Sequence, residues 1–282
     1  MALSRVRQIS EEGYNGGNQW ESSFRKVPAL ASTAGVWTDL SSAPGNPKPN
    51  YYTGTELTAT TLDGTTGVFH GGSVSPKTKV LHRVLIQSTS AGVVPATFQL
   101  LDYLAFHPLI DMDVTDEQEF TNPAPLPRYA DGVGVKAFLV ATNPYIGGAS
   151  FTIRYTDHLG RERVSPPALT NTSTTITSIL NSGRVAGAQG AFIPLAHDSR
   201  GIRSVQGITF LAPNGGLAAL VLVRPLATMT MTEVTAPSEW DFIAMKPTLP
   251  VVQDGAYLNF IVCPNGSIAA APITGLASFV WS

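Results

Sequence analysis

The sequence predicts an all-β protein, built as a β-sandwich or a jelly-roll-like domain. Short apolar or alternating stretches recur along the chain and are separated by turns rich in Gly and Pro. A spacing of about ten residues per strand is typical of sandwiches, whereas helices would need longer stretches with a period of about 3.6 residues. The chain shows no repeat of roughly 20–50 residues, which argues against a propeller or a solenoid.

Residues 201–235 carry the clearest strand signals. Residues 202–212 are rich in β-formers, residues 213–216 read Pro-Asn-Gly-Gly, and residues 217–223 are apolar. Thr and Met then alternate over residues 228–232, as in a strand with one buried face. An Asn-Gly pair between two such stretches favours a hairpin, because a primed turn needs positive φ at its central residues. We therefore expect three strands here, joined by tight turns.

The remaining strands are expected between Gly- and Pro-containing turns throughout the chain. Residues 42–49 and 108–128 are rich in proline and predict extended loops. The last strand ends the sequence, which indicates that the C-terminus is held in a sheet. The expected strands are residues 35–40, 53–69, 80–87, 96–106, 135–142, 150–156, 162–165, 174–179, 191–195, 256–263 and 278–281.

The composition favours a protein that lives in contact with other proteins. Of 282 residues, 43% are hydrophobic and only 13% are charged. The charged fraction is about half the usual ~25%, and surface charge is what normally keeps a free monomer in solution. The net charge of −2 excludes a general electrostatic attraction to nucleic acid.

Residues 1–27 differ from the rest and predict a short, partly helical N-terminal arm, followed by a β domain over residues 28–282. That domain is open to a division into two subdomains near residues 122–134. Two interpretations of the arm remain open: it lies on its own domain, or it docks on a neighbouring subunit. Its apolar side chains form two narrow helical stripes, broken by Gly16 and Gly17. The candidate assembly contacts are Leu3, Val6, Ile9, Trp20 and Phe24.

An acidic stretch over residues 111–119 is the best candidate for a cation site. Asp111, Asp113 and Thr115 occupy positions one, three and five of a calcium-loop pattern, but Asp116 stands where that loop needs glycine. We therefore expect a solvated or partner-facing acidic loop without tight calcium binding.

No catalytic or cofactor motif is recognisable, so the sequence predicts a protein that is not an enzyme and needs no cofactor or metal. The five histidines share no metal-ligand spacing, and the single cysteine, Cys263, allows neither an intramolecular disulfide nor a cysteine-rich zinc site. Residues 71–75 do not match the GxSxG pattern of a nucleophilic serine.

No secretory signal or membrane-spanning segment is expected. The apolar run that a signal peptide requires is replaced near the N-terminus by Ile-Ser-Glu-Glu at residues 9–12. The longest apolar stretch, residues 217–223, is far shorter than the ~20 residues of a membrane helix. We expect a soluble protein made in the cytoplasm.

Several short blocks of the sequence resemble a group of tailed-bacteriophage virion proteins whose individual roles are poorly defined. The resemblance covers most of residues 35–282 and leaves out the N-terminal arm. The resemblance assigns no catalytic role to any residue of this chain. The blocks are residues 35–40 (GVWTDL), 102–111 (DYLAFHPLID), 126–129 (LPRY), 131–135 (DGVGV), 153–157 (IRYTD), 160–161 (GR), 192–195 (FIPL), 201–205 (GIRSV) and 222–226 (LVRPL).

The resemblance implies a structural protein of the virion, and most simply a decoration or cement subunit on the capsid exterior. Its implied partners are copies of itself, in a symmetric oligomer, and other virion proteins such as the major capsid protein, with no role for nucleic acid or membrane. One alternative is a tail- or fibre-associated module that binds host glycan. A second, and the weakest, is an enzyme acting on polysaccharide.

Overall fold

Three antiparallel sheets make up the fold, which confirms the predicted all-β class and its sandwich-like architecture. The computed structural model describes residues 6–183, 190–234, 236–245 and 249–282. Helices among the described residues are short. They are α1 (Val6–Gln8), the π-helix η1 (Ile9–Tyr14) and α2 (Phe242–Met245), the last of which lies outside the arm where all helix was expected.

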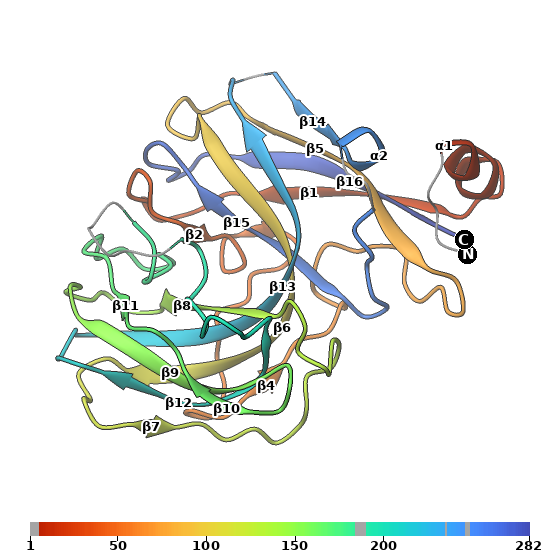
Figure 1. Ribbon diagram of the computed structural model, residues 1–282. Coiled ribbons are helices and arrows are strands. Elements are labelled where there is room, and N and C mark those ends of the chain that lie inside the picture. The colour runs from red at the N-terminus through yellow and green to blue at the C-terminus, as the bar shows by residue number, and fades with distance from the viewer. Residues whose placement is uncertain (1–5, 184–189, 235, 246–248) are drawn as a thin grey trace.

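The outer sheet lies at the top of Figure 1 and contains both the first and the last strand. The last strand pairs on both sides in this sheet, which confirms that the end of the chain is held in a sheet. In spatial order the strands are β14 (Ser238–Asp241), β5 (Lys79–Ser88), β16 (Ile273–Trp281), β1 (Gln19–Lys26) and β3 (Gly45–Asn46).

The central sheet is organised by two long strands that cross most of the molecule. Strand β6 (Ala96–Asp111) pairs with β13 (Leu217–Met231) over nearly their whole length. The other strands of this sheet are β2 (Thr38–Asp39), β15 (Tyr257–Cys263), β8 (Lys136–Ala141) and β4 (Thr60–Thr61).

The small sheet lies at the lower left of Figure 1, beside one half of the central sheet. Its two longest strands pair antiparallel over nearly their whole length. The strands are β10 (Glu162–Val164), β9 (Ser150–Asp157), β12 (Ile202–Phe210), β7 (Gln118–Glu119) and β11 (Ala168–Leu169).

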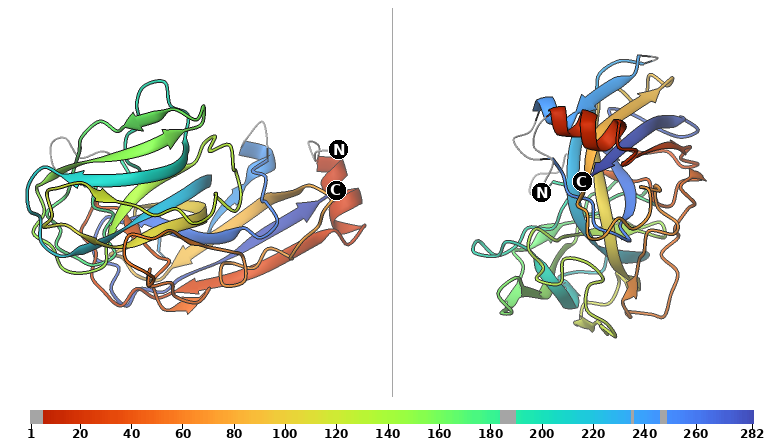
Figure 2. Two further views of the ribbon diagram at one scale, coloured as in Figure 1. Left: turned by 90° about the horizontal axis from the view of Figure 1, so that it is seen from below. Right: turned by 90° about the vertical axis from the view of Figure 1, so that its right-hand side faces the viewer.

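Two separate cores form because the outer and small sheets pack on different halves of the central sheet. The first core contains Phe98 and Leu100 of β6 together with side chains of the outer sheet. The second core contains Leu104 and Ile110 of the same strand together with side chains of the small sheet. A third cluster joins side chains of the central sheet, such as Tyr103, to Tyr52, Ile179 and Ala191 from loops. Figure 2 shows the small sheet and the outer sheet at opposite ends of the molecule.

The passage between the two cores falls inside β6 and β13. The chain enters the second core along β6 and returns to the first along β13. Residues 122–134, where a subdomain boundary was considered, lie against the second core, which contains Leu126. The second core is therefore formed by the part of the chain between two passages through the first core. Both cores share the long strands β6 and β13.

Residues 217–231 form one strand where the sequence predicted two. Proline lacks a backbone N–H and usually ends a strand, but Pro225 lies at an irregularity in the β13–β6 pairing. Register shifts at Leu222/Val223 and Pro225/Ala227 let the strand bend from the second core to the first without ending.

The expected hairpin around Asn214 is wrong, because the strands on its two sides enter different sheets. Strand β12 pairs with β9 and β7, whereas β13 pairs with β6 and β8. The Asn214 side chain is buried and accepts hydrogen bonds from Ala149 N (3.4 Å) and Thr170 Oγ1 (3.0 Å). Gly215 and Gly216 have φ of 70° and 75°, a conformation that favours glycine. The Asn214-Gly215 pair therefore lies in a turn that leads the chain from the small sheet into the central sheet.

The N-terminal arm packs on its own domain. Residues 19–26 form β1, a strand where the sequence suggested a second helical stripe, and pair with β16 from Gln19↔Val280 to Lys26↔Ile273. Phe24 lies in the first core, and Ile9 packs against Val80 and Val280. No helix of the described residues is long and apolar enough to cross a membrane.

Candidate functional site

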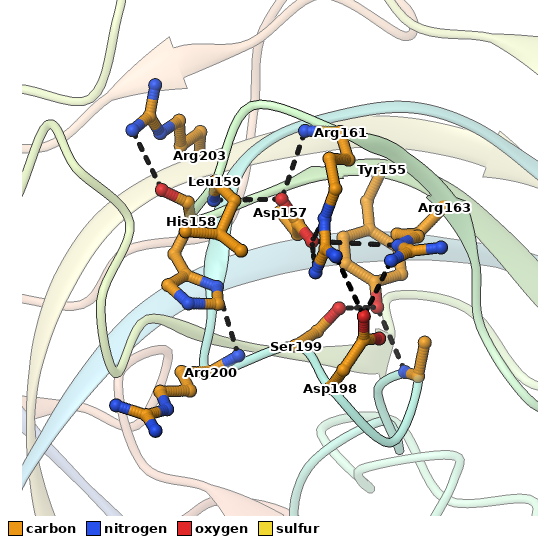
Figure 3. Close-up of polar contacts among 11 residues, drawn as sticks. Tyr155, Asp157, His158, Leu159, Arg161, Arg163, Asp198, Ser199, Arg200 and Arg203 are labelled. Carbon is orange, nitrogen blue, oxygen red and sulfur yellow. Dashed lines mark hydrogen bonds and ion pairs between the residues drawn. The ribbon is translucent and has the colours of Figure 1, made fainter.

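Three loops meet at one end of the small sheet and form a cluster of charged and polar side chains (Figure 3). They are residues 129–134, the turn 157–161 and residues 196–203. Gly201 and Val133 form an isolated β-bridge, and Gly134 N donates to Arg200 O at 2.8 Å. A Cβ on Gly201 would lie 2.0 Å from the Gly132 carbonyl oxygen, so the loops meet this closely only because a glycine stands there.

Asp157 is the buried centre of the cluster. It ends β9, and its Oδ1 accepts hydrogen bonds from the backbone N–H groups of Leu159 (2.8 Å) and Arg161 (3.0 Å). Its Oδ2 receives Nε (2.8 Å) and Nη2 (2.6 Å) of the Arg161 side chain. Burial opposes ionisation of this carboxyl, but the Arg161 and backbone hydrogen bonds outweigh it and hold its pKa well below the ordinary value.

Asp198 joins two arginines at the surface of the cluster. Its Oδ2 lies 2.8 Å from Arg161 Nη1 and 2.7 Å from Arg163 Nη2. Burial opposes the effect, but a backbone hydrogen bond and the two guanidinium groups lower its pKa. The two arginines and two aspartates are therefore mutually compensated, which fixes the geometry of the loops.

Tyr155 connects this ion-pair network to the second core. Its ring is fully buried, and its hydroxyl donates to Ser199 Oγ (2.9 Å) while accepting from Ala196 N (2.9 Å). The loop that carries Asp198 is thus fastened to a core side chain on β9.

The charged side chains of the cluster mainly hold one another in place. Its carboxylates are fully engaged with arginines and backbone N–H groups, so neither is placed to take a proton from a substrate. Within the described ranges, no group of three or more His, Cys, Asp or Glu side chains could hold a metal ion.

Sequence reasoning missed this cluster, although part of the signal was visible. Asp157 and Arg161 are four residues apart across a turn with Gly160, a spacing that allows a bidentate ion pair. Asp198 and Arg203 lie far along the chain from Asp157, and nothing in the sequence indicates that these segments meet. Four of the blocks that resemble virion proteins converge here, residues 131–135, 153–157, 160–161 and 201–205.

The candidate assembly contacts in the arm have different environments. Ile9 is 3% exposed and Phe24 is 2% exposed, so both are buried in their own chain and present no surface to a neighbour, which corrects the expectation for these two. Trp20 is 42% exposed, lies edge-on to Phe69 with ring centroids 5.1 Å apart, and stays a candidate. Leu3 and the side chain of Val6 lie outside the described residues.

The acidic stretch is ordered by local hydrogen bonds and by one arginine. Asp111 Oδ1 accepts from Asp113 N at 2.9 Å, as in a turn. Glu117 and Glu119 lie 2.7 Å and 3.7 Å from guanidinium nitrogens of Arg154 on β9. The expectation that this loop binds no calcium tightly stays a prediction.

A second buried polar network surrounds Asp39. Tyr52 and Tyr103 donate their hydroxyls to its carboxylate at 2.6 Å and 2.7 Å, and Ser41 donates both its N–H (3.0 Å) and its hydroxyl (2.5 Å). Burial, followed by the Asp39 charge, raises the pKa of both tyrosines well above the ordinary value. A mostly apolar pocket of about 270 Å³ opens above Asp39, but all these polar atoms already have partners.

Comparison with known proteins places the chain in no family. No family model matches it, and no curated protein matches it. A structure of infectious bursal disease virus Gt strain aligns over 93% of this chain and 80% of its own, with 8% identity and a TM-score of 0.18. A mutant VP2 protein of the same virus, in T=1 particles, aligns over 93% and 77% with 7% identity and a TM-score of 0.14. TM-scores this low carry no argument about fold or function.

Proposed function

We propose that this protein is a structural subunit of a bacteriophage particle and that it acts through contacts with other virion proteins. The observation that carries the proposal is the convergence of four resembling blocks on one exposed, arginine-rich end of the small sheet. Blocks far apart in the sequence thereby frame a single surface. That surface is held rigid by compensated ion pairs and by Tyr155, as a contact surface needs to be.

The proposed place of the subunit is the capsid exterior, as a decoration or cement protein. Its partners would be copies of itself and the major capsid protein, and it would need no enzymatic activity and no cofactor. The low charge content of 13% supports this role, because a subunit that is packed against neighbours relies less on surface charge for solubility.

A tail-associated module that binds host glycan is the second candidate. Exposed aromatic rings can stack on sugars, and Trp20 of the outer sheet forms an exposed aromatic pair with Phe69 of the loop before β5. If this role is the true one, Trp20→Ala should abolish binding of the protein to host cells. If the protein decorates the capsid, the substitution should have no effect on host-cell binding.

Copy number in purified virions tests the proposal. A decoration subunit should be present in hundreds of copies, whereas about a dozen or fewer would place it at a vertex, connector or fibre. Purified protein should also bind to particles that lack it and raise the temperature at which those particles release DNA. Absence of the protein from purified virions would contradict any structural role.

A further inference from the structure

Four cations beside the candidate site have no carboxylate partner among the residues that the structure describes. Arg203 donates to the carbonyl oxygens of Asp131 (3.2 Å) and His158 (2.7 Å). Arg224 donates to the carbonyl oxygen of Val133 and lies 5.4 Å from the centre of the Tyr129 ring. Carbonyl groups and rings orient a guanidinium without neutralising it. The four cations, here called the basic rim, are Arg200, Arg203, Arg224 and Lys136.

The loop 129–134 holds the basic rim together. Arg200 accepts a hydrogen bond from Gly134 N, and Arg224 contacts the neighbouring Val133. Lys136 follows directly on the chain, and its pKa is lowered first by burial and then by the charge of Arg224. Three carboxylates lie close by. Those of Asp102 and Asp157 are paired with Arg128 and Arg161, whereas that of Asp131 accepts a hydrogen bond from Val133 N at 3.1 Å. None of the three forms an ion pair with a cation of the basic rim, so the rim keeps an excess of positive charge.

The opposite end of the small sheet carries the reverse charge. Asp111, Asp113 and Asp116 form no ion pair with any cation of the described chain, and their loop is fixed by a hydrogen bond from Gly215 N to Asp113 Oδ1 at 2.8 Å. Large apolar side chains are exposed beside them. This end, here called the acidic tip, consists of Asp111, Asp113 and Asp116 with Val114 (37% exposed), Ile146 (72%) and Leu211 (62%).

The acidic tip cannot neutralise the basic rim of its own chain. Along β13, Leu217 pairs with Asp111 at the start of the strand, and Arg224 lies seven residues further along, near its middle. Seven residues of strand span about 23 Å. Along β12, Arg203 is separated by the same number of residues from Phe210, which directly precedes Leu211. Charges this far apart interact weakly, because the Debye length in physiological salt is about 8 Å.

We infer that the basic rim of one copy binds the acidic tip of a second copy, head to tail. Opposite charges are thereby brought together, and the apolar side chains of the tip are removed from water. Such a contact joins two different surfaces, so it repeats into a ring or a filament. The inference deepens the proposed function, because it names the partner at the same end of the small sheet.

A protein surface suits the basic rim better than a single phosphate does. The backbone N–H groups of Gly132, Val133 and Gly134, which would be needed to cradle a phosphate, already donate to Tyr129 O, the Asp131 carboxylate and Arg200 O. Recognition is left to side chains that project from several loops, and an acidic loop can meet several of them at once.

Charge reversal on each side tests the inference with the full chain. Arg200→Glu with Arg203→Glu should weaken self-association at least about tenfold in low salt, and Asp113→Lys with Asp116→Lys should do the same. An equimolar mixture of the two variants should associate again, because each then offers a surface complementary to the other. Sedimentation velocity at low and high salt measures all three, and high salt should weaken the wild type.

A matched control changes the same charge elsewhere. Arg25→Glu with Lys48→Glu reverses two exposed cations away from both ends and should associate like the wild type. Arg200→Glu alone removes a guanidinium that forms no salt bridge with a described residue, so it keeps the test open if loss of the Arg203 hydrogen bonds disturbs folding. A wild type that stays monomeric at all concentrations, or a mixture that fails to associate, overturns the inference.

Attachment to phage particles separates this inference from the proposed function. If charge-reversed protein still attaches to particles while the wild type shows no self-association, only the head-to-tail contact is wrong. If self-association follows charge as expected but the protein never attaches to particles, the contact stands and the virion role fails.

Discussion

The two cores share strands β6 and β13 but hold their buried charges in different ways. Beside the first core, Lys26 donates to the carbonyl oxygens of Ser41, Ala43 and Pro47 at 3.3, 3.0 and 2.8 Å. At the end of the second core, Asp157 is paired with Arg161. Neutral acceptors satisfy hydrogen bonds without compensating charge, so burial lowers the pKa of Lys26 to about 8, only partly opposed by Asp39.

A second buried lysine follows the first pattern. Lys79 lies 2.8 Å from His70 Nδ1, contacts the Gly72 carbonyl oxygen and reaches Asp254 at 3.6 Å. Burial lowers its pKa, and the Asp254 charge only partly opposes this. The first core therefore uses buried cations to fasten loops, whereas the second uses arginine–aspartate pairs that leave compensated charge at the surface. Arginine–aspartate pairs are better suited than buried lysines to a surface that contacts a partner.

The largest expected effect lies at the junction of the two cores. Arg128 forms a bidentate ion pair with the fully buried Asp102 of β6, at 2.9 and 2.8 Å. Arg128→Ala leaves that carboxylate unpaired, and breaking a buried pair in this way should cost about 5 kcal/mol of unfolding free energy. Chemical denaturation measures it. A loss below about 1 kcal/mol, similar to that of a surface pair, would contradict the role of this pair at the junction.

The next prediction asks whether the two cores unfold together. Phe24→Ala in the first core and Phe151→Ala in the second should each cost about 4 kcal/mol, because both rings are buried. Since β6 and β13 contribute to both cores, each variant should shift one common unfolding transition. Intrinsic fluorescence and circular dichroism should give the same midpoint, and two transitions, each moved by only one variant, would show that the cores are independent.

Acid should destabilise the protein between about pH 6.5 and pH 4. Burial, with the charge of Lys79, lowers the pKa of His70 to about 4, and burial lowers that of His107 to about 4. The unfolded chain therefore binds more protons in this range, and stability falls as the pH falls. Each histidine contributes about 3 kcal/mol, since one pK unit corresponds to about 1.4 kcal/mol.

His107→Gln and His70→Gln separate the two histidines, one beside each core. Each substitution should remove a large part of the acid-induced loss measured between these pH values, whatever its cost at neutral pH, while His82, whose pKa burial also lowers, retains a smaller part. Urea denaturation at several pH values gives the slope. An unchanged slope in both variants would assign the acid sensitivity to other groups.

The smallest effects are expected from surface ion pairs in either region. Arg83 pairs with Glu21 and Glu239 on the outer sheet, and Glu117 pairs with Arg154 on the small sheet. Arg83→Met and Glu117→Gln should each cost less than about 1 kcal/mol, because exposed pairs are screened by water and salt. A larger loss from Glu117→Gln alone would show that the acidic loop contributes more to stability than its exposure indicates.

Most expected strands formed where the signal was local, but residues 191–195 form no strand and residues 174–179 contribute only isolated bridges at Ser178 and Ile179. The alternation of apolar and polar residues in Ser150–Asp157 appears in β9 as strict alternation of buried and half-buried side chains. The apolar stretch at residues 257–262 became a strand buried on both faces. Both patterns depend only on which side of a pleated strand meets the core, so local sequence is sufficient to predict them.

Pairing partners could not be predicted in the same way. The Asn214-Gly215 turn has the composition of a hairpin, yet it joins two sheets. The buried Asn214 side chain accepts hydrogen bonds from Ala149 and Thr170, and these tertiary contacts outweigh the local turn preference. Residues 19–26 have too few apolar positions to predict a buried strand, and pairing with β16 on one side and β3 on the other supplies the stability that the sequence lacks.

The sequence by itself determined the all-β class, the low charge and the placement of most strands, because these depend on composition and on short-range periodicity. Only the tertiary structure decided that two cores share β6 and β13, that Ile9 and Phe24 belong to their own chain, and that Asp157, Asp198 and Arg203 meet at one end of the small sheet. The reason is physical: contacts between residues far apart in the chain depend on which sheets pack together, and local sequence carries no record of that choice.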